Sequence, residues 1–139
     1  MVMKKIGLTI FAVALIFATI QNFGDAFLSM FNGRSEGDNI VLTWQTGEEN
    51  GVKQFVVERK TVNSSFYDLG SVIAKGSNSV YTYVDQDAFN KGSDLLFIYR
   101  LKMVPNNPNV PPTFSKEVTV SHNVSSVKRT WGSIKALFR

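Results

Sequence analysis

The feature that most constrains this chain is a series of short segments in which apolar and polar residues alternate. Because successive side chains of a β-strand point to opposite faces of a sheet, such alternation predicts half-buried strands. Clusters of glycine, asparagine, serine and proline separate the segments, as expected for turns. Seven strands are predicted, at approximately Ala26 to Arg34, Asn39 to Gln45, Gln54 to Thr61, Phe66 to Ile73, Val80 to Val84, Leu95 to Val104 and Phe114 to Val120.

Short strands at this spacing predict an all-β sandwich or barrel. No apolar run of helical period lies between them, which excludes a parallel βαβ organisation. With 139 residues, the chain has room for one domain of roughly 100 to 150 residues and its tails. The chain has no cysteine, so its stability must come from packing rather than from disulfides.

The alternation also predicts which side chains form the core. Trp44 shares one face of its strand with Ile40 and Leu42, and a buried indole commonly anchors a small sandwich. A role for Trp44 in stacking on a ligand is the alternative. The remaining predicted core residues are Phe55, Val57, Tyr83, Tyr99, Leu101 and Met103.

The opposite faces of two of these strands carry charge. Glu58 lies on the third predicted strand, and Arg100 and Lys102 lie on the sixth. If these strands are neighbours, the simplest interpretation is a solvated ion pair across them, which stabilises a fold by about 0.2 to 1 kcal/mol.

The N-terminal segment predicts export. Lys4 and Lys5 precede an uncharged apolar run from Ile6 to Ile20, as in a signal peptide. The run is shorter than the roughly 20 apolar residues that a membrane-spanning helix needs, so removal of residues 1–26 is favoured over a retained N-terminal anchor. The small residues Gly24 and Ala26 provide a processing site before Phe27.

The positive charge of the chain is concentrated at its C-terminus. The whole chain has a net charge of +4, but from Phe27 to Val127 nine Lys or Arg face ten Asp or Glu, a net charge of −1. A nearly neutral body lacks the basic patch that follows a phosphate backbone, which argues against nucleic-acid binding by the domain.

Several sequence phrases occur in a characteristic order. Ile40–Thr46 reads IVLTWQT, Glu48–Asn50 reads EEN and Phe55–Arg59 reads FVVER; further on come Phe66–Val72 (FYDLGSV), Tyr81–Asp85 (YTYVD) and Tyr99–Lys102 (YRLK). Together, from about Ala26 to Val120, they resemble the fibronectin type III-like domains of exported bacterial proteins. This resemblance implies a seven-stranded antiparallel β-sandwich that serves as a spacer, adhesion or assembly module. The loop Pro105–Pro112 departs from the family pattern by being longer and richer in proline.

The sequence predicts no catalytic residue, no cofactor, no metal site and no small-molecule substrate. His122 is the only histidine and is expected at the surface, in a polar linker after the last strand. Glu48, Glu49, Asp85, Asp87 and Asp94 all fall at predicted turns, where such residues are common. A calcium site built from Asp85, Asp87 and Asp94 is the minority alternative, because the spacing of an EF-hand is missing.

The C-terminal residues predict a basic amphipathic helix. Val127, Trp131, Ile134 and Phe138 recur at helical spacing, with Leu137 at the edge of the apolar stripe. The cations Lys128, Arg129, Lys135 and Arg139 lie mostly elsewhere on the helix. Docking on its own sandwich, on a protein partner or on an anionic membrane all remain open.

These observations predict three regions: a signal peptide or N-terminal anchor at 1–26, a β-sandwich at 27–121, and a linker with a C-terminal helix at 122–139. The expected function is that of a non-enzymatic module outside the cytoplasm, extracellular or at the cell surface, with periplasmic or membrane-anchored placement as alternatives. It would assemble or adhere through the tail or through sheet edges, by binding a protein partner or a second copy. A glycan-binding or other ligand-binding module is the alternative function.

Overall fold

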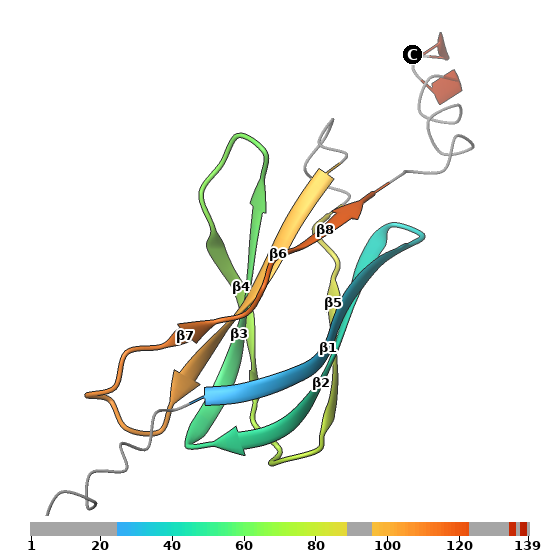
Figure 1. Cartoon of the computed structure of the whole chain (residues 1–139). Helices are drawn as coiled ribbons and strands as arrows, with labels where there is room; N and C mark the ends of the chain where they lie inside the picture. Colours follow the sequence, from blue (N-terminus) through green and yellow to red (C-terminus); the bar gives the residue numbers. More distant parts are fainter. Residues whose placement is uncertain (1–24, 89–95, 123–133, 136, 139) are drawn as a thin grey trace, which may run out of the picture.

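A computed structural model of the chain describes residues 25–88, 96–122, 134–135 and 137–138. Within these residues it contains eight β-strands, labelled in Figure 1. They are β1 (Asp25–Glu36), β2 (Asn39–Asn50), β3 (Val52–Thr61), β4 (Tyr67–Ile73), β5 (Val80–Asp85), β6 (Leu96–Pro105), β7 (Thr113–Phe114) and β8 (Val118–Ser121).

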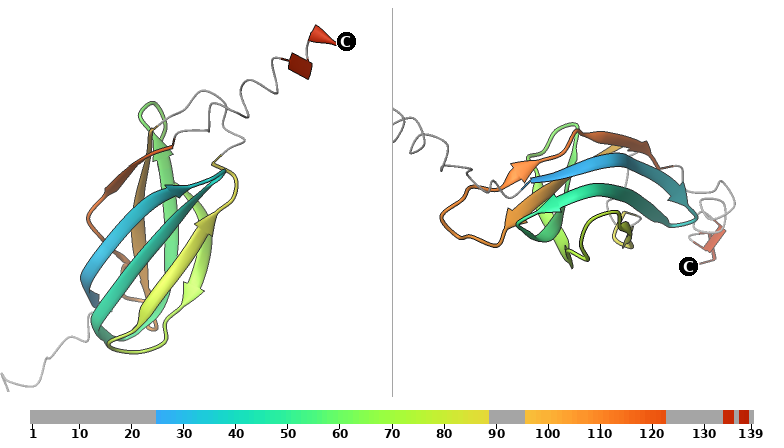
Figure 2. Two further views of the ribbon diagram at one scale, coloured as in Figure 1. Left: turned by 90° about the vertical axis from the view of Figure 1, so that its right-hand side faces the viewer. Right: turned by 60° about the horizontal axis from the view of Figure 1, so that its bottom comes forward.

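The strands form two antiparallel sheets that face each other, which confirms the predicted sandwich (Figure 2). One sheet has the order β1-β2-β5, and the other has the order β4-β3-β6-β7, with β8 also paired to β6. In this arrangement β3 and β6 are neighbours, so Glu58 lies directly opposite Arg100. Among the described strands β1 pairs only with β2, so it forms one edge of its sheet as described.

Two predicted strand boundaries are wrong. Strand β2 continues to Asn50 instead of ending before Gly47, and the chain turns into β3 at Gly51, where φ is 65°. The predicted strand from Phe114 to Val120 is broken into β7 and β8. Ser115 causes this break. Its backbone N–H donates to the carbonyl of Leu101, and its hydroxyl accepts from the Leu101 N–H, both at 2.9 Å. A side chain thus takes part in what would otherwise be a regular ladder of backbone hydrogen bonds.

The core between the sheets is built on aromatic rings. Trp44 is fully buried, stacks on Tyr81 with ring centroids 5.1 Å apart, and meets the edge of Phe55 at 5.8 Å. Such pairs add about 0.5 to 1.5 kcal/mol to the effect of burial alone. All the residues that the alternation places in the core are buried, except that Tyr83 is half-buried and packs against the core.

The two helices expected from the sequence fall mainly outside the described residues. Of the predicted signal peptide or anchor at 1–26, residues 1–24 lie outside them and Asp25 and Ala26 belong to β1; of the C-terminal segment only Ile134, Lys135, Leu137 and Phe138 are described. Among the described parts of the chain, no helix is long and apolar enough to cross a membrane.

Replacing Trp44 by alanine is expected to lower the free energy of unfolding by about 3 to 5 kcal/mol, because it removes the largest buried ring and leaves a cavity. Urea unfolding measures this change. The matched control is Thr82→Ala, an exposed position on the neighbouring strand β5, which should stay within about 0.5 kcal/mol of the parent. A Trp44→Ala protein that unfolds like the parent would contradict the structural role given to this ring.

Candidate functional site

An open groove lies between the edges of the two sheets, at the end of the sandwich where β1 begins. It has a volume of about 550 Å³. One wall is the first half of β1, from Ala26 to Phe31. The other wall consists of Met103 on β6 and the segment that contains β7 and the β7–β8 break, Phe114 to Val118. Figure 1 shows the start of β1 and β7 toward the same end of the molecule.

The groove ends where β1 and β8 come together. At Gly33, an added Cβ would lie 2.5 Å from Val120 Cγ2 and 2.9 Å from Leu42 Cδ2, so only glycine allows this close approach. Beyond that point Ser35 and His122 hydrogen bond across the two strands. In the first half of β1, by contrast, the opposite edge is interrupted by the Ser115 irregularity, and the sheets stay apart.

The β1 wall of the groove is uncharged and mainly apolar, whereas the opposite wall includes Lys116 and Glu117. Phe27 is 70% exposed and Phe114 is 47% exposed, while Leu28 and Phe31 pack partly into the core. Strand β1 carries no charged residue from Ala26 to Gly33. Natural edge strands are commonly protected from pairing by charges or proline, so a long uncharged edge beside exposed phenyl rings is a surface suited to a protein segment.

The β7 wall is held in place by a cation sandwiched between two rings. The Arg100 guanidinium lies 4.1 Å from the ring centroid of Phe114 and 4.0 Å from that of Phe66. Its Nε donates to Glu58 at 2.5 Å, and Lys102 Nζ lies 3.2 Å from the same carboxylate. Phe114 is therefore fixed in orientation while part of its ring stays open to solvent.

This cluster corrects the prediction of a solvated ion pair at Glu58. The carboxylate is buried, with only 7% of the side chain exposed, because Arg100 and Lys102 cover it from the neighbouring strand. Lys102 also bonds Asp68 at 2.8 Å. The hydrogen bond from Lys102 lowers the pKa of Asp68, and the Asp68 carboxylate in turn raises the pKa of Lys102.

A second polar cluster lies inside the sandwich and joins the two sheets. Arg59 on β3 forms a salt bridge with Asp85 on β5, and the two side chains are 1% and 2% exposed. The Tyr99 hydroxyl donates to Asp85 at 2.8 Å, and Arg59 Nε donates to the Tyr67 oxygen at 2.8 Å. Asp85 was expected at an exposed turn; it ends β5 facing inward instead, because Arg59 lies across the core.

The pKa values in this cluster follow from burial and charge. Burial is the main cause that raises the pKa of Tyr99, and the charge of Asp85 adds to it. Burial by itself would lower the pKa of Arg59, but the hydrogen bond with Tyr67 and the charge of Asp85 outweigh it and raise that pKa. Arg59 and Asp85 satisfy each other, so the cluster serves as a clamp between the sheets.

His122 is buried rather than exposed, which corrects the prediction of a surface residue. Its Nδ1 lies 2.8 Å from the Ser35 hydroxyl, and its ring lies beside Phe97. The linker prediction failed because β8 carries the chain across β1 before it leaves the sandwich. The described residues contain no group of three or more His, Asp or Glu that could hold a metal ion, and Asp94 lies outside them.

The residues predicted to bind a partner are only partly described. Ile134, Leu137 and Phe138 are 37%, 82% and 86% exposed. Lys135 is exposed as well. Val127, Lys128, Arg129, Trp131 and Arg139 lie outside the described residues, so a role for the tail remains a prediction. The sequence did not predict the groove, although the uncharged stretch in the first predicted strand could have indicated it.

The fold is an all-β sandwich of two antiparallel sheets. Among solved structures, the chain is similar to an Fn3-like protein from Clostridium thermocellum, with 17% sequence identity and a TM-score of 0.49. The similarity covers 72% of this chain and 95% of that chain, and concerns the fold alone. No protein-family model and no curated protein matches this sequence.

Replacing Asp85 by alanine is expected to destabilise the protein by about 3 to 5 kcal/mol, because Arg59 is left buried without its counter-charge. The double variant Arg59→Met with Asp85→Leu should recover much of this loss, since no unpaired charge remains. Urea unfolding of both variants measures the difference. The exposed pair Arg34–Glu36 provides the control, because Glu36→Ala should change stability by less than about 1 kcal/mol. Equal effects at Asp85 and Glu36 would contradict the clamp.

Stability is expected to fall as the pH rises above about 10, the ordinary pKa of tyrosine. Burial raises the pKa of Tyr81, Tyr83 and Tyr99 in the folded protein. Above this pH the unfolded chain releases these protons while the folded chain keeps them, so unfolding is favoured by up to about 1.4 kcal/mol per pH unit for each fully protected tyrosine.

Unfolding measured from about pH 8 to pH 11 tests this dependence. Replacing Tyr99 by phenylalanine should make the unfolding free energy fall less steeply with pH, because one proton fewer is released on unfolding. A stability that stays level across this range in the parent protein would show that these hydroxyls ionise as easily in the folded state as in the unfolded one.

Proposed function

We propose that this chain is a non-enzymatic module that works outside the cytoplasm in assembly or adhesion, and that it holds a protein partner at the groove between β1 and β7. The observation that carries this proposal is the uncharged edge of β1 with Phe27 and Phe114 exposed beside it. The sequence phrases that resemble fibronectin type III-like domains also support a binding role, because that family serves as spacer, adhesion or assembly modules.

The groove offers two kinds of contact to a protein segment. Strand β1 pairs with β2 on one side only, so its other edge presents backbone donors and acceptors to the groove. The walls of the groove also offer apolar surface. The volume of the groove, about 550 Å³, lies within the range of about 300 to 1,000 Å³ that is typical of pockets for small molecules. Strand addition and insertion of an apolar helix face are the two recognition modes that such a surface supports.

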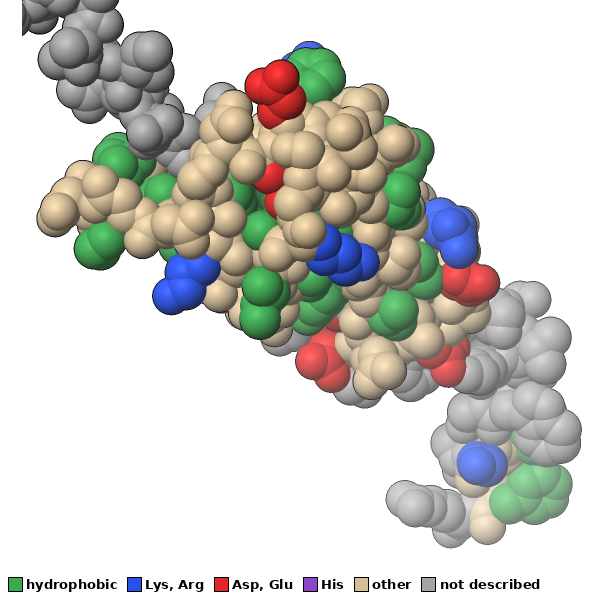
Figure 3. Space-filling view, turned by 90° about the horizontal axis from the view of Figure 1, so that it is seen from below, with side chains coloured by type: hydrophobic (Ala, Val, Ile, Leu, Met, Phe, Trp, Pro, Cys, Tyr) green, Lys and Arg blue, Asp and Glu red, His purple; other side chains and the backbone are tan. Residues whose placement is uncertain are grey.

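Charge contributes little to recognition on the face seen from below. Figure 3 shows positive and negative side chains dispersed among hydrophobic and uncharged ones on this face, rather than gathered into a patch of one sign. A face without a patch of positive charge does not suit a phosphate backbone, so nucleic acid is not proposed as a partner.

The proposed location rests on the N-terminal segment. Lys4 and Lys5 followed by the apolar run Ile6 to Ile20 support export, to the cell surface or the medium, with a periplasmic or anchored protein as the alternative. A membrane contact through the basic tail remains an alternative mode of attachment.

A glycan-binding module is the second candidate function. Phe27 and Phe114 are exposed phenyl residues on the two walls of the groove, and aromatic rings are suited to stacking on sugars. Binding of the protein to immobilised oligosaccharides that is lost in Phe27→Ala would favour this candidate over a protein partner.

A photoreactive phenylalanine derivative placed at Phe27 is expected to cross-link one defined protein in the native host, because this side chain lies in the groove and is exposed. The matched control is the same derivative at Ile73, which is 75% exposed but lies on β4, an edge of the other sheet. Mass spectrometry identifies the cross-linked chain. If Phe27 gives no protein product, or the same products as Ile73, the groove is not the site of attachment.

A further inference from the structure

Two apolar surfaces of this chain lack a described partner: the groove between β1 and β7, and the apolar side chains of the C-terminal segment. We propose that the C-terminal segment of one copy docks in the groove of a second copy, so that the protein assembles head to tail. This inference rests on the proposed function, because it names the partner that the groove holds.

The exposure of the described tail residues is the first argument. Leu137 and Phe138 are 82% and 86% exposed in the single chain, and Ile134 is 37% exposed. Lys135 is likewise exposed, and the Phe138 N–H donates to its carbonyl as in a helical turn. A segment that packed on its own sandwich would hide these side chains, so in the single chain they are open to contact with another molecule.

The groove matches this segment in kind. Phe27, Leu28, Met30 and Phe114 provide apolar walls, and the charged residues Lys116 and Glu117 lie on the same rim. An apolar stripe from Trp131 to Phe138 on a helix would insert its large side chains between these walls, as in the general helix-in-groove mode of recognition. Trp131 is the strongest anchor of the stripe, because tryptophan is enriched among residues that dominate interfaces.

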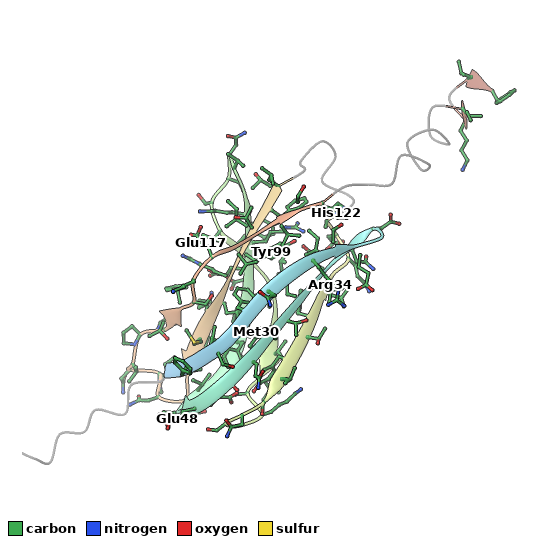
Figure 4. The ribbon with its side chains drawn as sticks, turned by 45° about the vertical axis from the view of Figure 1, so that its right-hand side comes forward. Met30, Arg34, Glu48, Tyr99, Glu117 and His122 are labelled. Carbon is green, nitrogen blue, oxygen red and sulfur yellow. The ribbon has the colours of Figure 1, made fainter. Side chains whose placement is uncertain are left out.

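The position of the two surfaces is the second argument. The chain leaves the sandwich at His122, which bonds Ser35 near the end of β1, whereas the groove lies along the start of β1. Figure 4 shows His122 and Arg34 toward one end of the sandwich and Glu48 at the other, with Met30 between them. The last described residue of the sandwich thus lies toward the end opposite the start of β1, an arrangement that suits contact between one copy and the next.

Charge favours a second copy of this chain as the occupant. The C-terminal segment carries Lys128, Arg129, Lys135 and Arg139, whereas the body from Phe27 to Val127 has a net charge of −1. Glu48 is exposed at the end of the sandwich opposite His122, and Glu117 is exposed on the groove wall, where Lys116 lies beside it and Lys60 pairs with it. The segment of one copy is thus attracted to the body of another, and the attraction should weaken with salt.

The symmetry of this contact determines whether assembly continues beyond a dimer. The segment and the groove are different surfaces, so the contact is heterologous and can repeat from copy to copy without closing. Pairing of two β1 edges would instead use the same surface twice and would stop at a dimer. The two arrangements therefore differ in what happens when one surface is removed.

Sedimentation of the exported protein, purified from its native host, tests the proposal with two variants. One variant ends at Ser126 and keeps the groove; the other keeps the segment and carries Phe27→Glu in the groove. The parent is expected to form assemblies that grow with concentration, and each variant alone should be a monomer. An equimolar mixture of the two variants should form a dimer and nothing larger, because it offers one segment and one groove.

A matched control variant and an interface variant make this test specific to the proposed contact. Ile73→Glu, at an equally exposed apolar site on β4, should assemble like the parent. Trp131→Ala in the Phe27→Glu chain should weaken the mixed dimer about tenfold or more, as expected for a central interface tryptophan.

Cross-linking identifies the contact directly, because the chain has no cysteine of its own. A chain carrying Phe27→Cys with Phe138→Cys is expected to form a ladder of disulfide-linked species on oxidation. A disulfide within one chain would mean that the segment docks on its own sandwich, and would overturn the proposal.

Three sedimentation results would also overturn it: a parent that is monomeric at all concentrations, a mixture of variants that stays monomeric, or a chain ending at Ser126 that assembles like the parent. The last would point to β1 pairing. The proposed function and this inference fail separately. If the derivative at Phe27 captures a different protein in the host, the groove binds a partner but not a second copy; if it captures no protein, the proposed function fails as well.

Discussion

The ion pair between Arg59 and Asp85 is the interaction on which this sandwich depends at one end. It joins β3 of one sheet to β5 of the other, and Tyr99 and Tyr67 complete its hydrogen bonds. A buried pair of this kind is weak evidence for stability by itself, because desolvating two charges costs several kcal/mol per ion in real proteins. Its effect is on specificity, since a sandwich that shifted its sheets would leave both charges buried and unpaired.

Aromatic packing joins the two sheets in the middle of the sandwich. Trp44, Tyr81 and Phe55 form a continuous set of ring contacts that spans β2, β5 and β3. Burial of such rings supplies most of the free energy that holds the sheets together. Clamp and rings together make the interior rigid, so the surface features at the sheet edges are presented from a fixed frame.

The groove follows from how the two sheets meet at their edges. Gly33 lets β1 and β8 approach closely in one half of the molecule, and Ser115 interrupts the opposing edge in the other half. The sandwich therefore closes at one end and opens at the other. This open edge with exposed phenyl rings is the surface at which the proposed contacts, including that with the C-terminal segment of a second copy, would form.

The sequence by itself determined the sheets and the core, because alternation fixes which side of each strand is buried. Trp44, Phe55 and Leu101 could be placed in the core on this ground alone. Tertiary structure alone decided which polar residues are buried. Asp85 and His122 look like surface residues in sequence, yet both are buried, because their partners Arg59 and Ser35 lie 26 and 87 residues away along the chain. The groove was equally hidden, since it arises from the distance between two sheet edges, and no periodicity within a single strand records that distance.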